Sequence, residues 1–254
     1  HFLNYHSYTD IHENHVNQSI YGAMSTIYEV ILSASKGVPV KIVSILDYTS
    51  GADILLSQSR INNLIGLKGR TVGVEFGTIS HFTALKALEM AGLEKKDVKF
   101  VFKSMLELIE DFKLDKIDVI STFEPFATEI LQNHGVNKLF SSKQIPRKIC
   151  DVFYINPNRI SDDKVISKFS KSWLVTSREA LVFSKKIQKK MNEFYNKTNV
   201  NYIFSLDGIR ITGEMENKIA FSDNGYLIQA LFEMMEFMYA HDVIKNKVDV
   251  TKLF

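Results

Sequence analysis

The sequence predicts an α/β fold, and three observations support that prediction. Strand-like and helix-like segments alternate along residues 19–142, with short polar connections between them. Some strand-like segments, such as VKIVSIL over residues 40–46, are almost continuously apolar, which is typical of strands covered on both faces. The alternation breaks after Asp47 and restarts at Arg70. The second block is long enough to form a lobe by itself.

The first block contains a helix between two strands, and the second block repeats the alternation of strand and helix. Gly37 marks the end of the first predicted helix, and apolar residues at helical spacing predict the helix itself: Ile27, Val30, Ile31 and Ala34. The predicted strands are 19–24, 40–46, 71–76, 98–102, 118–123 and 138–142, and the predicted helices are 25–37, 80–91, 104–114 and 126–133.

Two similar segments flank the second block. GADILLSQSRI and CDVFYINPNRI each contain an apolar strand, then polar residues, then an Arg-Ile pair. Strands of this kind, at 53–58 and 151–156, are what a chain needs in order to leave one lobe and return to it. The remainder, 161–254, is mostly amphipathic helix. Its methionine cluster is expected to pack in the core; the cluster contains Met234, Met235 and Met238.

Composition places the chain among ordinary globular proteins and argues against several functions. Its 254 residues are 45% hydrophobic and 24% charged, and the net charge of +2 gives no broad basic field for nucleic acid. The single cysteine, Cys150, rules out an intrachain disulfide. No apolar run reaches the roughly 18 residues of a membrane span. Because the start shows neither an initiator methionine nor a signal-peptide core, we expect a mature or excised piece of something longer.

Motifs of common enzymes are absent from the sequence. It contains no G-x-S-x-G, no Walker A, no H-E-x-x-H, and no G-x-G-x-x-G after a strand. His12 and His15, in the segment HENH, are expected on a surface helix rather than at a metal. We therefore expect the chain not to be an enzyme and to hold neither cofactor nor metal.

Four segments together resemble a known family. They are LDYTSGADILL from Leu46, LKGRTVGVEFGTIS from Leu67, ALEMAGL from Ala87 and DKIDVISTFEP from Asp115. In this order and spacing the sequence resembles the nitrate/sulfonate/taurine-type substrate-binding proteins of ABC transporters, which include binding proteins for pyrimidine precursors of thiamine. The resemblance covers nearly the whole chain. It implies a type II periplasmic-binding-protein fold, with two α/β lobes joined by two crossover strands and closing on a ligand in the cleft.

The resemblance also implies domain limits and a function. Lobe 1 would comprise 1–63 and 150–254, and lobe 2 would comprise 64–149. Members of the family have a strand and a helix before the segment that matches Phe2 onward, so lobe 1 as numbered lacks its first strand and helix. The implied function is periplasmic or extracytoplasmic capture of a small anionic or zwitterionic molecule for the permease subunits of an ABC importer. Sulfonates, nitrate and pyrimidine precursors are the implied ligands.

Two other functions stay open. The same fold serves as the ligand-sensing ectodomain of a membrane-bound histidine kinase or cyclase, in which case the partner would be an attached transmembrane signalling module. The fungal thiamine-pyrimidine biosynthetic enzymes also resemble this chain. They carry a cysteine-rich motif, however, which a sequence with only Cys150 does not match.

The best candidate for ligand contact is the turn that leads into the predicted helix 80–91. In an open parallel sheet, ligands lie outside the carboxyl ends of the strands. Gly77 lets backbone approach a ligand, the hydroxyls of Thr78 and Ser80 can donate, and the helix start favours an anion by about 0.3–2 kcal/mol. The alternative is that Thr78 or Ser80 only caps its own helix. His81 follows and can either donate to a ligand or pack.

Further candidates lie at three other turns. Ser25 and Thr26 open the corresponding lobe 1 helix, with the same two interpretations. Asp47 and Ser50 lie at the approach to the hinge, where Asp47 can bind an amine or hydroxyl or cap the turn around Gly51. Thr122 and Glu124 belong to the E-P turn, which the family places at the cleft. Pro125 beside them also fits an ordinary helix start.

Overall fold

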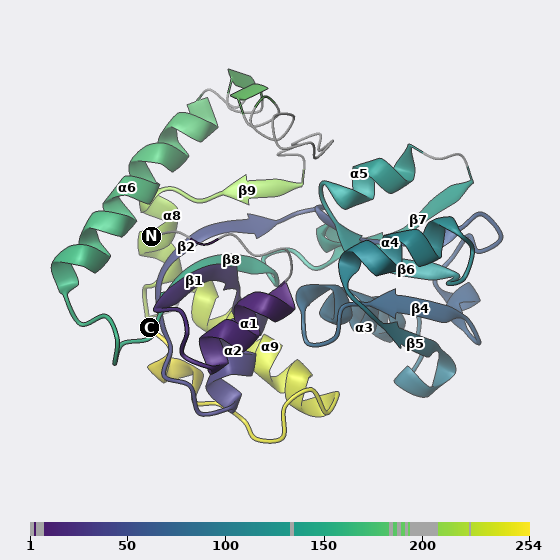
Figure 1. The fold of residues 1–254 in the computed structure, drawn as a ribbon, viewed down its shortest axis with the longest axis horizontal. Coiled ribbons are helices and arrows are strands. Elements are labelled where there is room, and N and C mark those ends of the chain that lie inside the picture. Colours follow the sequence, from purple (N-terminus) through teal and green to yellow (C-terminus); the bar gives the residue numbers. More distant parts are fainter. Residues whose placement is uncertain are drawn as a thin grey trace. The chain divides into compact units, whose positions relative to one another are not determined.

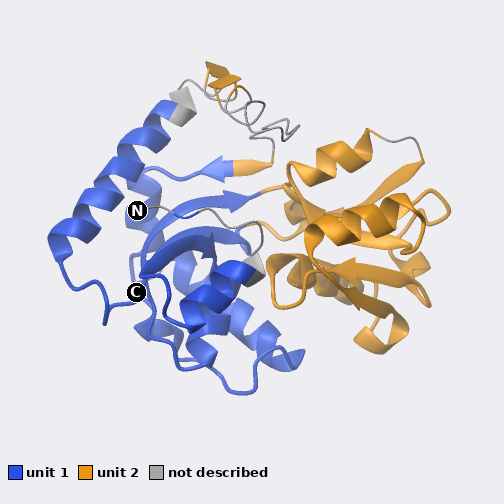
Figure 2. Ribbon diagram, in the orientation of Figure 1, with its two compact units in different colours: residues 1–49, 147–184, 210–254 blue, residues 50–146, 185–209 orange. Residues whose placement is uncertain are grey.

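The structure is a computed structural model in which the chain divides into two compact units (Figure 2). It describes residue 3 and residues 8–132, 135–182, 185–186, 189–190, 193, 208–223 and 225–254. Unit 1 comprises residues 1–49, 147–184 and 210–254, and unit 2 comprises residues 50–146 and 185–209. The chain thus enters unit 2 after Thr49 and first returns to unit 1 at Arg147.

Unit 1 is built on a four-stranded sheet in the order β1-β8-β2-β9 (Figure 1). Its strands are β1 (Gly22–Thr26), β2 (Lys41–Thr49), β8 (Cys150–Ile155) and β9 (Ile209–Ile211). Because β8 pairs antiparallel with both β1 and β2, those two strands run parallel to each other, as the alternating pattern predicted. They are not neighbours, however, because a strand from far along the chain separates them.

The helices of unit 1 bury their apolar sides against this sheet and one another. They are α1 (Tyr8–Val16), α2 (Ile27–Ser35), α6 (Asp163–Val182), α8 (Glu214–Ala220) and α9 (Tyr226–Ala240), with a 3₁₀ turn η4 (Val250–Lys252). Helix α2 packs against α9, β1 and β8, and α6 and α8 contact β2. The methionines of α9 are almost fully buried, so the prediction of core packing is confirmed for Met234, Met235 and Met238.

The two histidines of α1 are buried, which corrects the expectation of a surface helix. His12 is 5% exposed and His15 is 0% exposed. The Nζ of Lys36 lies 2.8 Å from Nε2 of His12, and Nδ1 of His12 lies 3.1 Å from Oγ of Ser33. A lysine donor at Nε2 requires a neutral imidazole that donates from Nδ1. His12 therefore holds α1 against α2, a packing role that spacing alone did not reveal.

Unit 2 contains a five-stranded sheet in the order β5-β4-β6-β3-β7. The strands are β3 (Asp53–Gln58), β4 (Thr71–Val74), β5 (Lys99–Phe102), β6 (Val119–Phe123) and β7 (Val136–Ser141). Strand β4 pairs parallel with β5 and β6, whereas β3 pairs antiparallel with β6 and β7. The segments expected as crossovers, 53–58 and 151–156, correspond to β3 and β8. Each is an interior strand of one sheet, and the chain changes unit shortly before each of them.

Among the residues that the structure describes within 50–146, three α-helices and three 3₁₀ turns accompany the sheet of unit 2. They are α3 (Ile79–Met90), α4 (Met105–Lys113) and α5 (Phe126–Leu131), with η1 (Ile65–Leu67), η2 (Lys95–Asp97) and η3 (Ser142–Gln144). Leu108 and Phe112 of α4 and Ile130 of α5 form a buried cluster with Ile54 of β3 and Ile120 of β6. This packing fixes the helix starts relative to the strand ends.

None of the described helices is long and apolar enough to cross a membrane.

Candidate functional site

One edge of the unit 2 sheet collects most of the predicted site residues. Strands β4, β5 and β6 run in the same direction, so their carboxyl ends at Val74, Phe102 and Phe123 lie along one edge. Each is followed within a few residues by a helix start. Three helix N-termini therefore emerge at the edge where the topology of open α/β sheets places ligands. This edge of the unit 2 sheet includes the turn at Gly77 and the residues Thr122 and Glu124.

The hydroxyls of the turn before α3 are used within the turn. Thr78 is the N-cap of α3, and its Oγ1 accepts from Ser80 N at 3.3 Å and donates to the carbonyl of Glu75 at 2.8 Å. Ser80 Oγ accepts from Glu75 N at 2.9 Å. The capping interpretation thus describes these side chains. The N–H groups of Ser80, His81 and Phe82 also bond Thr78, so what the turn presents beyond itself is the positive end of the α3 dipole.

Gly77 makes this geometry possible. Its φ of +71° lies in the left-handed region, a backbone conformation that residues other than glycine adopt only with strain. The residue is buried in the turn, directly before the N-cap Thr78. The short strand-to-helix connection therefore depends on glycine at this position.

His81 lies inside an aromatic cluster. It is 4% exposed, and its ring centroid lies 5.4 Å from Phe100, 5.5 Å from Phe76 and 5.6 Å from Phe102. The packing interpretation of His81 therefore describes its ring. The three phenylalanines were not among the predicted site residues, although they flank the same turn.

The other predicted residues of unit 2 have mixed surroundings. Thr122 is 1% exposed, and its Oγ1 has no hydrogen-bond partner among the described residues. Glu124 accepts from Thr128 N at 3.1 Å and donates its own N–H to the carbonyl of Ala52. The N–H of Ser50 donates to Gly208 O at 2.6 Å. Thr122 is thus the one predicted residue of this edge whose buried hydroxyl has no hydrogen-bond partner among the described residues.

In unit 1, Ser25 and Thr26 surround a buried carboxylate that the sequence analysis overlooked. Thr26, the last residue of β1, is the N-cap of α2, and Ser25 lies in the strand rather than opening the helix. Oε2 of Glu29 accepts from Thr26 N at 3.1 Å, from Ser25 Oγ at 3.2 Å and from Thr26 Oγ1. The Thr-Ile-Tyr-Glu sequence is a capping box, so the signal for Glu29 was present in the sequence.

The environment of Glu29 disfavours its charge. The residue is 0% exposed, and among the described residues Oε1 has no hydrogen-bond partner. Burial raises the pKa of Glu29 to about 7, with a further contribution from Asp151, against the lowering effect of the Thr26 and Ser25 hydrogen bonds. Near neutral pH this carboxyl therefore exists in both protonation states.

Asp47 faces another carboxylate across the sheet. It pairs with Asp151 of β8, which on its other side pairs with Thr26 of β1. The neighbouring Cys150 is buried, and burial together with Asp151 and Asp47 raises the pKa of its thiol. A thiol in such surroundings stays protonated at neutral pH.

A cationic side chain stands at the same edge of unit 1. The guanidinium of the exposed Arg147 lies 5.7 Å from the ring centroid of Tyr48 and 5.2 Å from that of Tyr226. Both distances are typical of cation–π contacts. Tyr48 is the next-to-last residue of β2 and Tyr226 begins α9, so residues far apart in sequence form this stack. No local pattern in the sequence could have indicated it.

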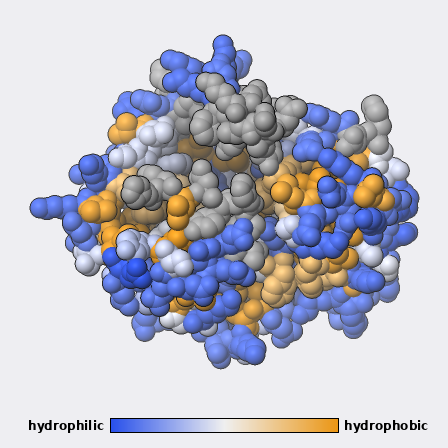
Figure 3. Space-filling model, in the orientation of Figure 1, coloured by the Kyte–Doolittle hydropathy of each residue, from blue (hydrophilic) through white to orange (hydrophobic). Residues whose placement is uncertain are grey.

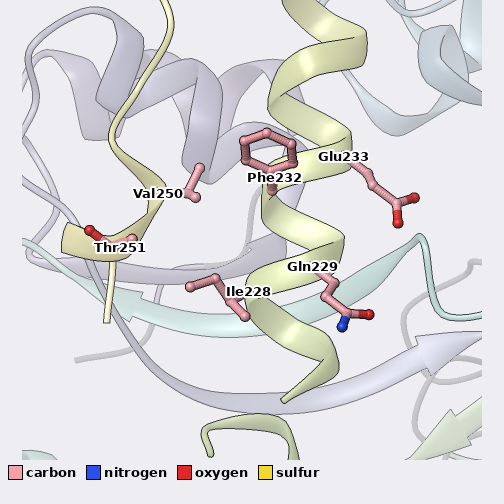
Figure 4. Close-up of a pocket in the computed structure, with 6 residues that line it drawn as sticks. All are labelled: Ile228, Gln229, Phe232, Glu233, Val250 and Thr251. Carbon is pink, nitrogen blue, oxygen red and sulfur yellow. The ribbon is translucent and has the colours of Figure 1, made fainter. Parts of the chain in front are cut away.

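A separate pocket of about 260 Å³ lies on unit 1 (Figure 4). It is lined by Ile228, Gln229, Phe232, Glu233, Val250 and Thr251. None of these is a predicted site residue, and the carboxylate of Glu233 pairs with Lys148. The pocket offers mainly apolar contacts. In the parts of the chain described here, no three His, Cys, Asp or Glu side chains gather as metal ligands would.

Two solved structures with this architecture are sulfonate-binding proteins. The alkanesulfonate-binding protein SsuA from Xanthomonas axonopodis pv. citri, bound to MOPS, matches with a TM-score of 0.79 and 12% identity over 95% of this chain and 82% of that chain. The periplasmic aliphatic sulphonate binding protein SsuA from Escherichia coli matches with a TM-score of 0.77 and 17% identity, over 96% and 83%. The predicted fold class, a two-lobed α/β fold of the type II periplasmic-binding-protein class, is confirmed.

The family follows from the sequence itself. The family model described as NMT1/THI5 like matches residues 8–174. The chain belongs to the NMT1/THI5-like family, and the resemblance to nitrate/sulfonate/taurine-type binding proteins is confirmed. No curated protein sequence matches the chain.

One expectation is contradicted by these comparisons. The desulfurization enzyme DszB matches with a TM-score of 0.68 and 12% identity, over 94% of this chain and 84% of that chain. The prediction that the chain is not an enzyme is therefore wrong as an inference from fold and motifs, because an enzyme shares this architecture.

Proposed function

We propose that the protein binds a small anionic or zwitterionic molecule outside the cytoplasm and delivers it to the permease of an ABC importer. The ligand classes we propose are sulfonates, nitrate and pyrimidine precursors. The proposal is supported by the family, by the fold shared with two sulfonate-binding proteins, and by the helix starts along the carboxyl edge of unit 2. One observation carries it: the Gly77–Ser80 turn presents the N-terminus of α3, a 12-residue helix, at that edge.

The turn suits an anion for an electrostatic reason. The α3 dipole places partial positive charge at the start of the helix, which favours a negatively charged group there. Because Thr78 and Ser80 are already engaged in the cap, we propose that they position the start of α3 rather than donate to the ligand themselves. Thr122 remains a proposed donor, since its hydroxyl is buried and has no partner among the described residues.

In unit 1 we propose that Asp47, Ser25 and Thr26 line the corresponding edge, and that Arg147 supplies positive charge beside them. A carboxylate and a guanidinium at one sheet edge suit a zwitterion better than a simple anion, because each charge of the ligand then meets its opposite.

The test is a thermal-shift screen followed by calorimetry with sulfonates, nitrate, aminopyrimidines and small carboxylates. A ligand at 100 times its Kd is expected to stabilise the protein by about 2.7 kcal/mol. For a compound that binds, the double variant Thr78→Ala and Ser80→Ala is expected to weaken affinity about tenfold, because the cap no longer fixes the start of α3.

The control is Thr251→Ala, which removes a hydroxyl from the exposed 3₁₀ turn of unit 1 that bonds Asp249 at 2.6 Å. It should leave affinity unchanged. If a folded wild-type protein binds none of the compounds, the proposed function is wrong. If the double variant binds as tightly as wild type, the assignment of the α3 turn fails.

A further inference from the structure

Two phenylalanine side chains stand exposed beside the α3 turn. Phe76 is 58% exposed and Phe102 is 49% exposed. Phe102 is the last residue of β5 and pairs with Val74, the last residue of β4, and Phe76 follows two positions later. Both rings therefore lie at the carboxyl edge, next to the start of α3. Figure 3 shows that unit 2 exposes hydrophobic residues among hydrophilic ones on the face in view.

The rings of Phe76 and Phe102 pack against each other and against two further aromatic rings. The centroids of Phe76 and Phe102 lie 5.1 Å apart with an interplanar angle of 82°. Phe100 stacks on Phe102 at 5.8 Å and 11°, and the buried ring of His81 contacts all three. A supported pair of rings loses little freedom when another group packs on it. The four residues Phe76, His81, Phe100 and Phe102 are called the aromatic platform below.

The exposure of these rings is not explained by folding. Water-exposed phenylalanine contributes little to a core, and a polar residue would serve equally well at the end of an edge strand. Two rings also cover far less than the roughly 800 Å² that each partner contributes to a stable protein interface. A planar ring of a small molecule, by contrast, matches the platform in size and shape.

We propose that the ligand carries an aromatic ring that packs on the aromatic platform while its anionic group meets the positive end of the α3 dipole. This inference rests on the proposed binding function and narrows its ligand to aryl or heteroaryl anions. The platform and the α3 turn are adjoining parts of one edge of unit 2, since Phe76 immediately precedes Gly77. A ligand of modest size can therefore contact both.

The experiment compares ligands that share an anionic group and differ in the ring. Calorimetry is run with benzenesulfonate against methanesulfonate and with benzoate against acetate. Each aryl compound is expected to bind about tenfold more tightly than its alkyl partner, or better. Phe76→Ala and Phe102→Ala are each expected to remove most of that preference and to leave the affinity for the alkyl compound unchanged.

Phe232→Ala is the matched control. Phe232 is 52% exposed on α9 of unit 1, so its truncation removes a similar ring from a different surface, and it should alter neither affinity. Phe76→Leu keeps an apolar side chain without a ring, and it should lose the aryl preference as Phe76→Ala does. Circular dichroism checks that each variant is folded.

The outcomes separate the two proposals. Equal binding of aryl and alkyl compounds, or a preference that survives both alanine substitutions, overturns the aromatic platform and leaves the binding function standing. Phe76→Ala and Phe102→Ala could instead keep the aryl preference and lose binding to a permease. The two rings would then belong to a protein interface, and the inference would again be overturned. If wild type binds neither pair nor any compound of the wider screen, both proposals fall together.

Discussion

Replacing Gly225 with alanine is expected to lower the free energy of unfolding by about 3 kcal/mol or more. Gly225 is the N-cap of α9, and a Cβ at this position would lie 2.0 Å from the carbonyl oxygen of Ala220 and 2.7 Å from that of Ile219. Both are backbone atoms at the end of α8, so the clash cannot be relieved by turning a side chain. Helix α9 would have to shift and disturb the buried face that contains Met234 and Met238. Urea unfolding measures the loss.

Gly213→Ala provides the matched control for this prediction. Gly213 is the N-cap of α8, and a Cβ there would meet nothing within 4 Å. Both substitutions exchange a glycine for alanine at an N-cap, a change that costs about 1 kcal/mol or less by itself. The difference between the two variants therefore isolates the close approach of α8 and α9. Equal losses in the two variants would contradict the steric explanation.

The second large effect is a dependence of stability on pH that comes from Glu29. The pKa of this carboxyl is about 7 in the folded protein against an ordinary value of 4.5. Between these values the folded protein holds a proton that the unfolded chain has released. The free energy of unfolding contributed by Glu29 is therefore fully present below pH 4.5 and falls as the pH rises. By pH 7 the loss reaches about 3 kcal/mol.

Glu29→Gln tests this dependence, because glutamine is neutral throughout and keeps an oxygen that accepts hydrogen bonds. The stability of the variant relative to wild type is expected to rise by about 3 kcal/mol between pH 4.5 and 7.5. Comparison with wild type is necessary because His12 and His15 also make the free energy of unfolding depend on pH, with the opposite sign. Burial lowers the pKa of each to about 4, so their stabilising contribution is lost as the pH falls from 6.5 toward 4.

Glu107→Gln is the matched control for Glu29. Glu107 holds the same position in the capping box of α4, but it is exposed. Hydrogen bonds from Ser104 lower its pKa, so its contribution has the opposite sign and lies at acidic pH. Urea unfolding at several pH values compares the two variants with wild type. A Glu29→Gln difference that stays flat from pH 4.5 to 7.5 would show that this carboxyl is ionised throughout.

The sequence predicted the local elements well because their causes are local. The apolar run before Asp47, the helix stop at Gly37 and the glycine turn before α3 all appear where the periodicity indicated. The start of α2 was misplaced by two residues, since both Ser25 and Thr26 are good N-caps and only the structure shows which one bonds Tyr28 N. Glu29 was predictable from its capping box, but its burial was not.

Long-range features escaped prediction for a physical reason. The insertion of β8 between β1 and β2 depends on pairing between residues more than 100 positions apart, and nothing in CDVFYI specifies its neighbours. The stack of Arg147 on Tyr48 and Tyr226 has the same origin. The burial of His12 was missed because α1 packs on α2, and the polar sequence of α1 does not indicate a buried face.

The position of β8 determines when the sheet of unit 1 can form during synthesis of the chain. Every strand of the unit 2 sheet comes from one continuous stretch, residues 53–141. The sheet of unit 1, in contrast, joins β1 to β2 only through β8. During synthesis from the amino terminus, the sheet of unit 2 can therefore form as soon as this stretch has left the ribosome, while β1 and β2 wait with unpaired edges. A chaperone that shields nascent chains has most to protect in residues 22–49, until residue 155 has emerged.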